Sequence, residues 1–138
     1  EIWHDTKGAV THFVSSMRTT GTIVGTSRFL KEKNSSIQII GVQPEEGAQI
    51  LGIRKWPKEY LPSIFDDSNI YSIRTVSQNN AEETARNLAK QEGIFSGAST
   101  GGALYVALEI AKKTPKAVIV SIACDRGDRY LSTGIFPA

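Results

Sequence analysis

Three threonines and a glycine stand directly after a strand-like run, in the stretch SSMRTTGT at residues 15–22. A helix that begins at such a loop offers unpaired N–H groups and the positive end of its dipole, and both favour an anion. The hydroxyls of Thr19, Thr20 and Thr22 can donate hydrogen bonds to phosphate oxygens, and Gly21 permits close approach of the backbone. The stretch therefore predicts a phosphate site, although a threonine-rich helix cap without a ligand would use the same residues. Neither GxxxxGK[ST] nor GxGxxG, the two common nucleotide-binding patterns, occurs in the chain.

A second glycine-bearing helix entry is the stretch GASTGG at residues 97–102. Ser99 or Thr100 can simply cap the helix that follows, so capping and ligand binding are both open here. Cys124 closes the last predicted strand, where a free thiol is either a small buried apolar residue or part of a pocket.

Other polar residues predict structure rather than chemistry. His4 and His12 have no Cys, His or carboxylate partner at metal-ligand spacing, so no metal site is predicted and both are expected to be structural or solvent-facing. The charged run DRGDR at residues 125–129 is typical of a local ion-paired turn.

The elements that must position these residues follow from hydrophobic periodicity. Short apolar, β-branched runs predict strands at 9–14, 37–42 and 117–123, the last two covered on both faces. Apolar positions at helical spacing predict three helices. The first covers 22–34, the second follows caps at 77–80, and the third is entered from the bend within 94–113. Thr20 or Thr22 is expected to cap the first helix, and Gly93 to end the second.

Residues 43–75 break these patterns and predict a long connection. Prolines at 44, 57 and 62 oppose regular structure there, while Trp56 and Tyr60 favour an ordered segment. The order of elements predicts an α/β fold, a three-layer α/β/α domain with a mainly parallel sheet. Ligands of such sheets lie at the carboxyl ends of strands, so both glycine-bearing bends and Cys124 are expected to converge.

Composition limits the classes of function. The chain has 138 residues, of which 40% are hydrophobic, and this suits one soluble core. A net charge of +2 with scattered basic residues argues against nucleic acid or an acidic membrane as a partner. A single cysteine cannot form an internal disulfide and suits a reducing compartment such as the cytoplasm. The opening Glu1-Ile2-Trp3, without a methionine, suggests processing, cleavage or an incomplete chain.

The segments taken together resemble one family, the pyridoxal-phosphate enzymes of the cysteine synthase type, and within it the B-type O-acetylserine sulfhydrylases. The resemblance extends over essentially the whole chain, and the matching segments occur in the family's order. They are EIW, THFVSSM, TTGT, SRFLKEKN, GVQPEEG, GIRKWP, YLP, GIFSGASTGGA and CDRGDRYLSTGIF.

The resemblance implies roles for the two glycine-bearing bends. Thr19, Thr20, Gly21 and Thr22 correspond to the family's cradle for the 5′-phosphate of pyridoxal phosphate, and Ser99 corresponds to the serine that hydrogen-bonds the pyridine nitrogen. A neutral hydroxyl in that place is not expected to hold the nitrogen protonated, so the cofactor would be a mild electron sink suited to β-elimination.

The resemblance also implies a substrate and a sulfur donor. Arg54, Trp56 and Cys124 correspond to a pocket that the B type uses for bulky donors such as thiosulfate, while Lys55 stands where a second arginine is often found. The implied reaction replaces the acetoxy group of O-acetylserine by sulfide or thiosulfate, which gives cysteine or S-sulfocysteine. Family members act on small molecules, as cytoplasmic homodimers.

Two departures from the family pattern bear on activity. The family's Schiff-base lysine lies in an N-terminal part that this chain does not contain, so residues 1–138 are expected to form most of the larger domain of a fold type II enzyme and to need the missing part. Arg18 replaces the glycine that opens the phosphate loop. If that position needs a positive φ, arginine introduces strain, and weakened cofactor binding is expected, unless its guanidinium contacts the phosphate instead.

Three readings therefore stand side by side. The first is part of a cysteine synthase, active only with the missing part. The second is a non-catalytic remnant or a binding module for phosphate or a phosphorylated metabolite. The third, a plain α/β domain without a ligand, requires the accumulated matches to be coincidence.

Overall fold

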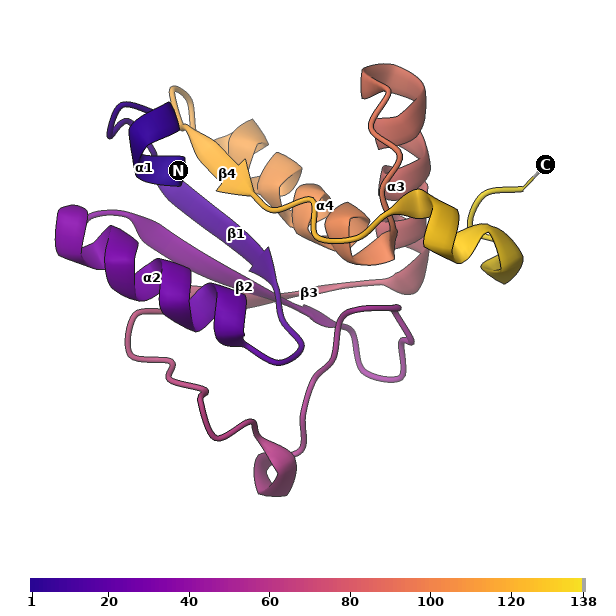
Figure 1. Ribbon diagram of the computed structural model, residues 1–138, viewed down its shortest axis with the longest axis horizontal. Helices are drawn as coiled ribbons and strands as arrows, with labels where there is room; N and C mark the ends of the chain where they lie inside the picture. Colours follow the sequence, from indigo (N-terminus) through magenta and orange to yellow (C-terminus); the bar gives the residue numbers. More distant parts are fainter. Residues whose placement is uncertain (138) are drawn as a thin grey trace.

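A computed structural model describes residues 1–137, and its centre is a four-stranded sheet in which every strand is parallel to its neighbours (Figure 1). The strand order is β3-β2-β1-β4. The strands are β1 (His12–Ser16), β2 (Gln38–Pro44), β3 (Ser72–Val76) and β4 (Ile119–Ser121). The predicted α/β fold with a mainly parallel sheet is confirmed.

Helices cover both faces of this sheet, which gives the three predicted layers. Figure 1 shows α2 across one face, while α4 lies along the other face with α3 packed against it. The α-helices are α1 (Ile2–Asp5), α2 (Gly21–Lys33), α3 (Gln78–Glu92) and α4 (Ala98–Lys113), and two 3₁₀ helices are η1 (Lys58–Tyr60) and η2 (Gly127–Thr133).

Two apolar clusters hold the layers together, and neighbouring residues of one strand contribute to opposite clusters. Phe13 packs in the cluster beneath α2, which also contains Ile23 and Leu30. Val14 packs in the cluster beneath α4, which also contains Val106. Successive strand side chains point to opposite faces, so adjacent apolar residues such as Phe13 and Val14 are what a sheet covered on both faces requires.

The caps predicted for α3 are present. The Ser77 hydroxyl accepts a hydrogen bond from the Asn80 backbone N–H at 3.1 Å, and this satisfies one of the free donors at the helix start. At the other end, Gly93 has a φ of 69°, a conformation that glycine adopts without steric cost. The sequence therefore places both ends of this helix correctly.

The prediction of a long irregular connection over residues 43–75 is wrong at both ends, because β2 extends through Pro44 and β3 occupies Ser72–Val76. This strand pairs with β2 at the edge of the sheet, and only its last residue, Val76, is buried. The other strands were predicted from short runs of apolar residues. Most side chains of β3 are polar or exposed, so its sequence contains no such run.

The last strand also differs from its prediction. β4 is shorter than the expected 117–123, and all three of its residues are only partly buried. It lies at the other edge of the sheet and pairs with β1 alone. The apolar run predicts a strand buried on both faces, but in the structure its residues remain partly exposed because no strand lies on their other side.

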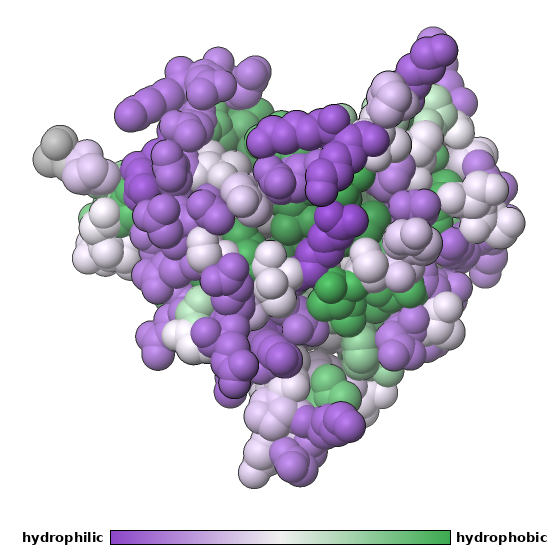
Figure 2. Space-filling view, turned by 180° about the vertical axis from the view of Figure 1, so that it is seen from behind, coloured by the Kyte–Doolittle hydropathy of each residue, from purple (hydrophilic) through white to green (hydrophobic). Residues whose placement is uncertain are grey.

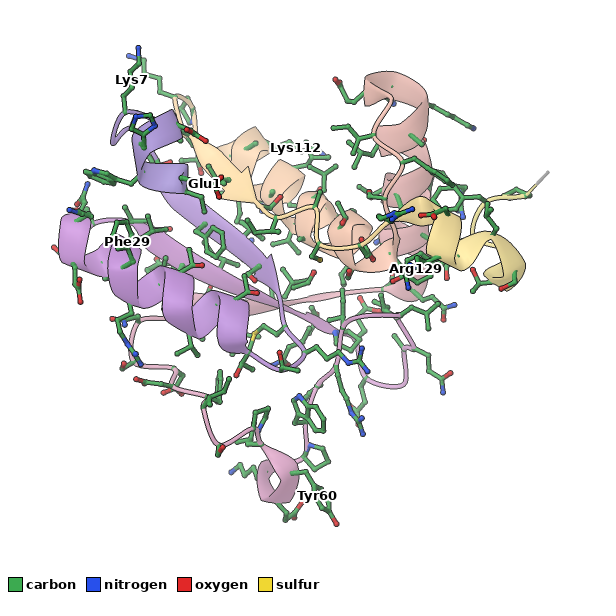
Figure 3. The ribbon with its side chains drawn as sticks, in the orientation of Figure 1. Glu1, Lys7, Phe29, Tyr60, Lys112 and Arg129 are labelled. Carbon is green, nitrogen blue, oxygen red and sulfur yellow. The ribbon has the colours of Figure 1, made fainter. Side chains whose placement is uncertain are left out.

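The surface mixes hydrophilic side chains with exposed apolar ones, as Figure 2 shows for the face seen from behind. In Figure 3 the side chain of Lys7 points away from the body, and Tyr60 lies near the tip of the long connection. No helix in residues 1–137 is long and apolar enough to cross a membrane. Within the same residues, no group of three His, Cys, Asp or Glu side chains is placed to hold a metal ion.

Candidate functional site

The two glycine-bearing bends and Cys124 do converge at the carboxyl end of the sheet. The Ser16 hydroxyl, at the end of β1, donates to the backbone carbonyl of Ser99 at 2.6 Å. The Cys124 Sγ lies 3.1 Å from the Ser99 Oγ. Gly52 also approaches closely, since a Cβ built on it would lie 3.0 Å from the Ser99 Oγ. Segments far apart in the sequence thus meet around the start of α4.

The start of α2 is open to an anion. Thr20 is the N-cap residue, with a φ of 69°, and its side chain accepts no hydrogen bond from the helix. The residue is only 4% exposed, and in the described chain its hydroxyl has no hydrogen-bond partner. The first turn of α2 also holds no acidic residue. Thr20 is thus the N-cap residue, one of the two that the sequence offered, but its hydroxyl makes no capping hydrogen bond.

The other residues predicted at this bend lie on the surface beside Thr20. Thr19, Gly21 and Thr22 are all exposed, and Gly21 begins α2. Arg18 is exposed as well, and it is not among the residues with a positive φ. The expectation of backbone strain at Arg18 is therefore wrong, since the positive φ of this loop falls on Thr20 instead.

The start of α4 is occupied by a carboxylate of the chain itself. One oxygen of Asp125 accepts hydrogen bonds from the Gly97 N–H at 3.0 Å and from both the N–H and the hydroxyl of Thr100. The other oxygen accepts from Ser99, from the N–H at 3.1 Å and from the hydroxyl at 2.6 Å. Helix N-termini favour a negative charge, and here Asp125 supplies it.

Two sequence predictions are corrected by this arrangement. The N-cap residue of α4 is Gly97, and the hydroxyls of Ser99 and Thr100 donate to Asp125 rather than cap the helix. In the charged run, Arg126 pairs with Asp128 at 2.7 Å as expected, but Asp125 turns inward and takes no part in that turn.

The electrostatics around Asp125 follow from these contacts. Burial raises the pKa of its carboxyl, but the hydrogen bonds from Ser99, Thr100 and Gly97 together hold that pKa below its ordinary value. Burial raises the pKa of Tyr130 to about 12, and the negative charge of Asp125 and a hydrogen bond to it add to this rise. At neutral pH the cluster therefore contains an ionised Asp125 beside a protonated Tyr130.

Arg54 and Trp56 lie together at the rim of a neighbouring cleft. The Arg54 guanidinium carbon is 4.1 Å from the centre of the Trp56 ring, a cation–π contact, and the Trp56 indole N–H donates to the Arg18 carbonyl. Both residues line an open cleft of about 830 Å³ that also includes Lys55. Cys124 does not line this cleft and contacts Ser99 instead.

The sequence prediction also assigned Asp125 wrongly, to a surface turn. One signal was available, because an acidic residue just after a strand of a parallel sheet lies at the edge where helices begin. Its membership of a charged run suggested a surface turn, and nothing in the sequence distinguishes the inward carboxylate from Asp128.

Residues 1–125 match the protein family described as "Pyridoxal-phosphate dependent enzyme". Cysteine synthase B of Salmonella typhimurium is 58% identical over 136 residues, which cover 99% of this chain and 45% of that protein. Cysteine synthase of Aquifex aeolicus is 44% identical, and 43% of it is covered. The chain thus spans less than half the length of these relatives.

Solved structures agree with these matches. O-acetyl serine sulfhydrylase isoform 3 from Entamoeba histolytica superposes with a TM-score of 0.84 at 32% identity, over 99% of this chain and 44% of that one. O-ureido-L-serine synthase superposes with a TM-score of 0.89 at 31% identity, over 98% of this chain and 46% of that one.

Proposed function

The chain belongs to the pyridoxal-phosphate dependent enzyme family, and from this premise we propose that it supplies part of a B-type cysteine synthase active site. The proposed reaction is replacement of the acetoxy group of O-acetylserine by sulfide or thiosulfate. The observation that carries the proposal is a pair of helix N-termini at the carboxyl end of the sheet. At the start of α2 the Thr20 hydroxyl has no hydrogen-bond partner in the described chain, and at the start of α4 the Asp125 carboxylate accepts the hydrogen bonds.

The residues present fit pyridoxal phosphate. A phosphate at the start of α2 would meet the free N–H groups of the first helical turn and the unpartnered hydroxyl of Thr20. Ser99 lies at the start of α4, and its backbone carbonyl accepts a hydrogen bond from Ser16, the last residue of the strand that leads to the α2 loop. At the start of α4, Asp125 already supplies the negative charge, so we assign the phosphate to the start of α2. The family resemblance assigns the ring nitrogen to Ser99.

When bound, pyridoxal phosphate would supply an electron sink for the bond changes in the amino-acid substrate. The chain's own part in the proposed reaction is binding and orientation. Thr20 and the N–H groups of α2 would hold the phosphate, and Ser99 would contact the ring nitrogen. The cation of Arg54, in cation–π contact with Trp56, would attract an anionic sulfur donor.

A second candidate function is a non-catalytic module that binds phosphate or a phosphorylated metabolite. The observation in its favour is that, in residues 1–137, no lysine hydrogen-bonds to Ser99, Asp125 or Thr20. Under the first proposal, the lysine that forms the Schiff base with the cofactor comes from the part of the relatives that this chain does not match. The complete enzyme is then a homodimer of the cytoplasm that acts on small molecules.

Complementation separates the two candidates. The chain is produced together with the segment of Salmonella cysteine synthase B that it does not match, and cysteine formation from O-acetylserine and sulfide is measured. Activity that needs both pieces supports the cysteine synthase proposal. A stable complex without activity would favour the binding module.

The substitution Thr20→Val tests the phosphate site in the chain alone. Valine has the shape of threonine without the hydroxyl, so removing a buried unpartnered polar group should raise the stability of the unliganded chain by about 1 kcal/mol. It should also weaken binding of pyridoxine 5′-phosphate about tenfold, the loss of one hydrogen bond to a charged group. Thermal unfolding and a fluorescence titration measure the two effects.

Opposite signs of the two effects are what distinguish a ligand site from a simple packing role. Thr22→Val serves as the control for stability, because Thr22 is exposed. The same titration includes Arg18→Gly, for which we propose tighter binding once the long side chain is removed from the loop. Binding unchanged by Thr20→Val would contradict the proposed site.

A further inference from the structure

The open cleft of about 830 Å³ lies at the carboxyl ends of two neighbouring strands. Its lining includes Pro44, where β2 ends, and Gln78, which begins α3 directly after β3. Ligands of parallel sheets bind at this end of the strands, and the volume is within the range of small-molecule sites. The proposed function uses the cleft only at its rim, where Arg54 lies.

Charged side chains of both signs line this cleft. They are Glu45, Glu46, Glu82, Arg54 and Lys55. In the part of the chain that the structure describes, none of these five forms an ion pair. Opposite charges attract each other, so the absence of any pair among them means that the fold holds these charges apart around the cleft.

One charge of each sign is held in place by a neighbour that also lines the cleft. The Arg54 guanidinium carbon lies 4.1 Å from the centre of the Trp56 ring. The Glu82 carboxylate accepts a hydrogen bond from the Gln78 side-chain amide at 3.0 Å. Neither contact neutralises the charge, so the cleft offers an oriented cation from the long connection and an oriented carboxylate from α3 before any ligand binds.

We propose that this cleft binds an α-amino acid, whose carboxylate contacts Arg54 and whose ammonium group contacts Glu82. A ligand that carries both charges complements both groups, whereas a simple anion or cation would leave one of them unpaired. The substrate and the product of the proposed function are amino acids, so such ligands are present where that reaction runs. The inference goes beyond the proposed function, because binding in this cleft needs neither pyridoxal phosphate nor the unmatched part of the relatives.

The test uses three small molecules that differ in their charged groups. L-Serine carries both groups, ethanolamine lacks the carboxylate, and 3-hydroxypropanoate lacks the ammonium group. Each is titrated into the full chain, labelled with ¹⁵N, at pH 7 and without a cofactor. The NMR signal of the Trp56 indole N–H reports on the cleft, and the indole signal of Trp3, which lines a separate cavity, is the internal reference.

L-Serine should shift the Trp56 signal and bind about tenfold more tightly than either molecule with a single charge. Glu82→Gln and Arg54→Gln should each weaken serine binding about tenfold, the loss of one hydrogen bond between charged groups. The matched controls are Glu83→Gln and Lys58→Gln, two exposed residues that do not line the cleft, and both should keep the affinity of the wild type.

Three results would each overturn the inference. They are a Trp56 signal that serine does not shift, equal affinities for the three molecules, and equal affinities of the Glu82→Gln and Glu83→Gln proteins for serine. None of them bears on the proposed function, which complementation tests separately. Thr20→Val should leave serine binding unchanged, and a loss of binding in that variant would overturn the inference by assigning the amino acid to the phosphate site instead.

Discussion

Gly101→Ala is expected to lower the free energy of unfolding by about 3 kcal/mol, the upper range for overpacking a core. Gly101 lies in the first turns of α4, where the helix crosses α3. A Cβ built on Gly101 would collide with the Ala81 carbonyl oxygen and lie 3.0 Å from the Ala85 nitrogen. Both are backbone atoms of α3, so no side chain can rotate away and the two helices must separate.

Separation of α3 from α4 should also disturb the site, because Ser99 and Thr100 precede Gly101 directly and hold Asp125. Urea denaturation followed by circular dichroism measures the loss of stability. The matched control is Gly25→Ala in α2, where a Cβ meets no atom within 4 Å. Alanine there should raise stability by about 0.5–1 kcal/mol, because glycine is the poorer helix former. Equal effects of the two substitutions would contradict this account of the helix crossing.

The sequence was sufficient where local signals and tertiary packing agree. Ser77 and Gly93 mark the ends of α3 by capping chemistry that acts within a few residues. Ile39 and Ile40 lie in the nearly continuous apolar run at 37–42, which indicates a strand covered on both faces before any partner strand is known, and the two residues pack in opposite clusters.

The sequence failed where a residue's role depends on a distant segment. Ser72–Val76 becomes a strand because β2 offers it a parallel partner, although most of its side chains are exposed. Asp125 looks like its neighbours in the charged run, and only the position of α4 explains why it turns inward while Asp128 pairs at the surface. The left-handed backbone of Thr20 is equally invisible, since glycine at position 21 is the residue that the pattern marks for such a conformation.

Asp125→Ala is expected to reduce the free energy of unfolding by roughly 2–4 kcal/mol at pH 7. The change removes the carboxylate that accepts hydrogen bonds from the Ser99 and Thr100 hydroxyls. These residues are only 3% and 4% exposed, and each buried polar group left without a partner costs about 1–3 kcal/mol. It also exposes the start of α4 without a capping acceptor. Asp128→Ala, which breaks only the exposed pair with Arg126, should cost less than about 1 kcal/mol.

The pH dependence of this loss has a definite sign. Hydrogen bonds from α4 hold the pKa of Asp125 in the folded chain below its ordinary value, and the ordinary value of about 3.9 applies in the unfolded chain. The stability that Asp125 contributes as an anion is therefore fully present above about pH 4 and is lost as the pH falls through the folded-state pKa.

Urea unfolding at pH 7, 5, 4 and 3 should show a constant difference between the wild type and Asp125→Ala down to about pH 4, and a smaller difference at pH 3. A difference that stays the same at pH 3 would mean that packing around Tyr130 and Gly97, rather than the charge on Asp125, holds the start of α4. Because Ser99 and Thr100 donate to this one carboxylate, the same titration indicates how firmly the serine that the family resemblance assigns to the cofactor ring is held in place.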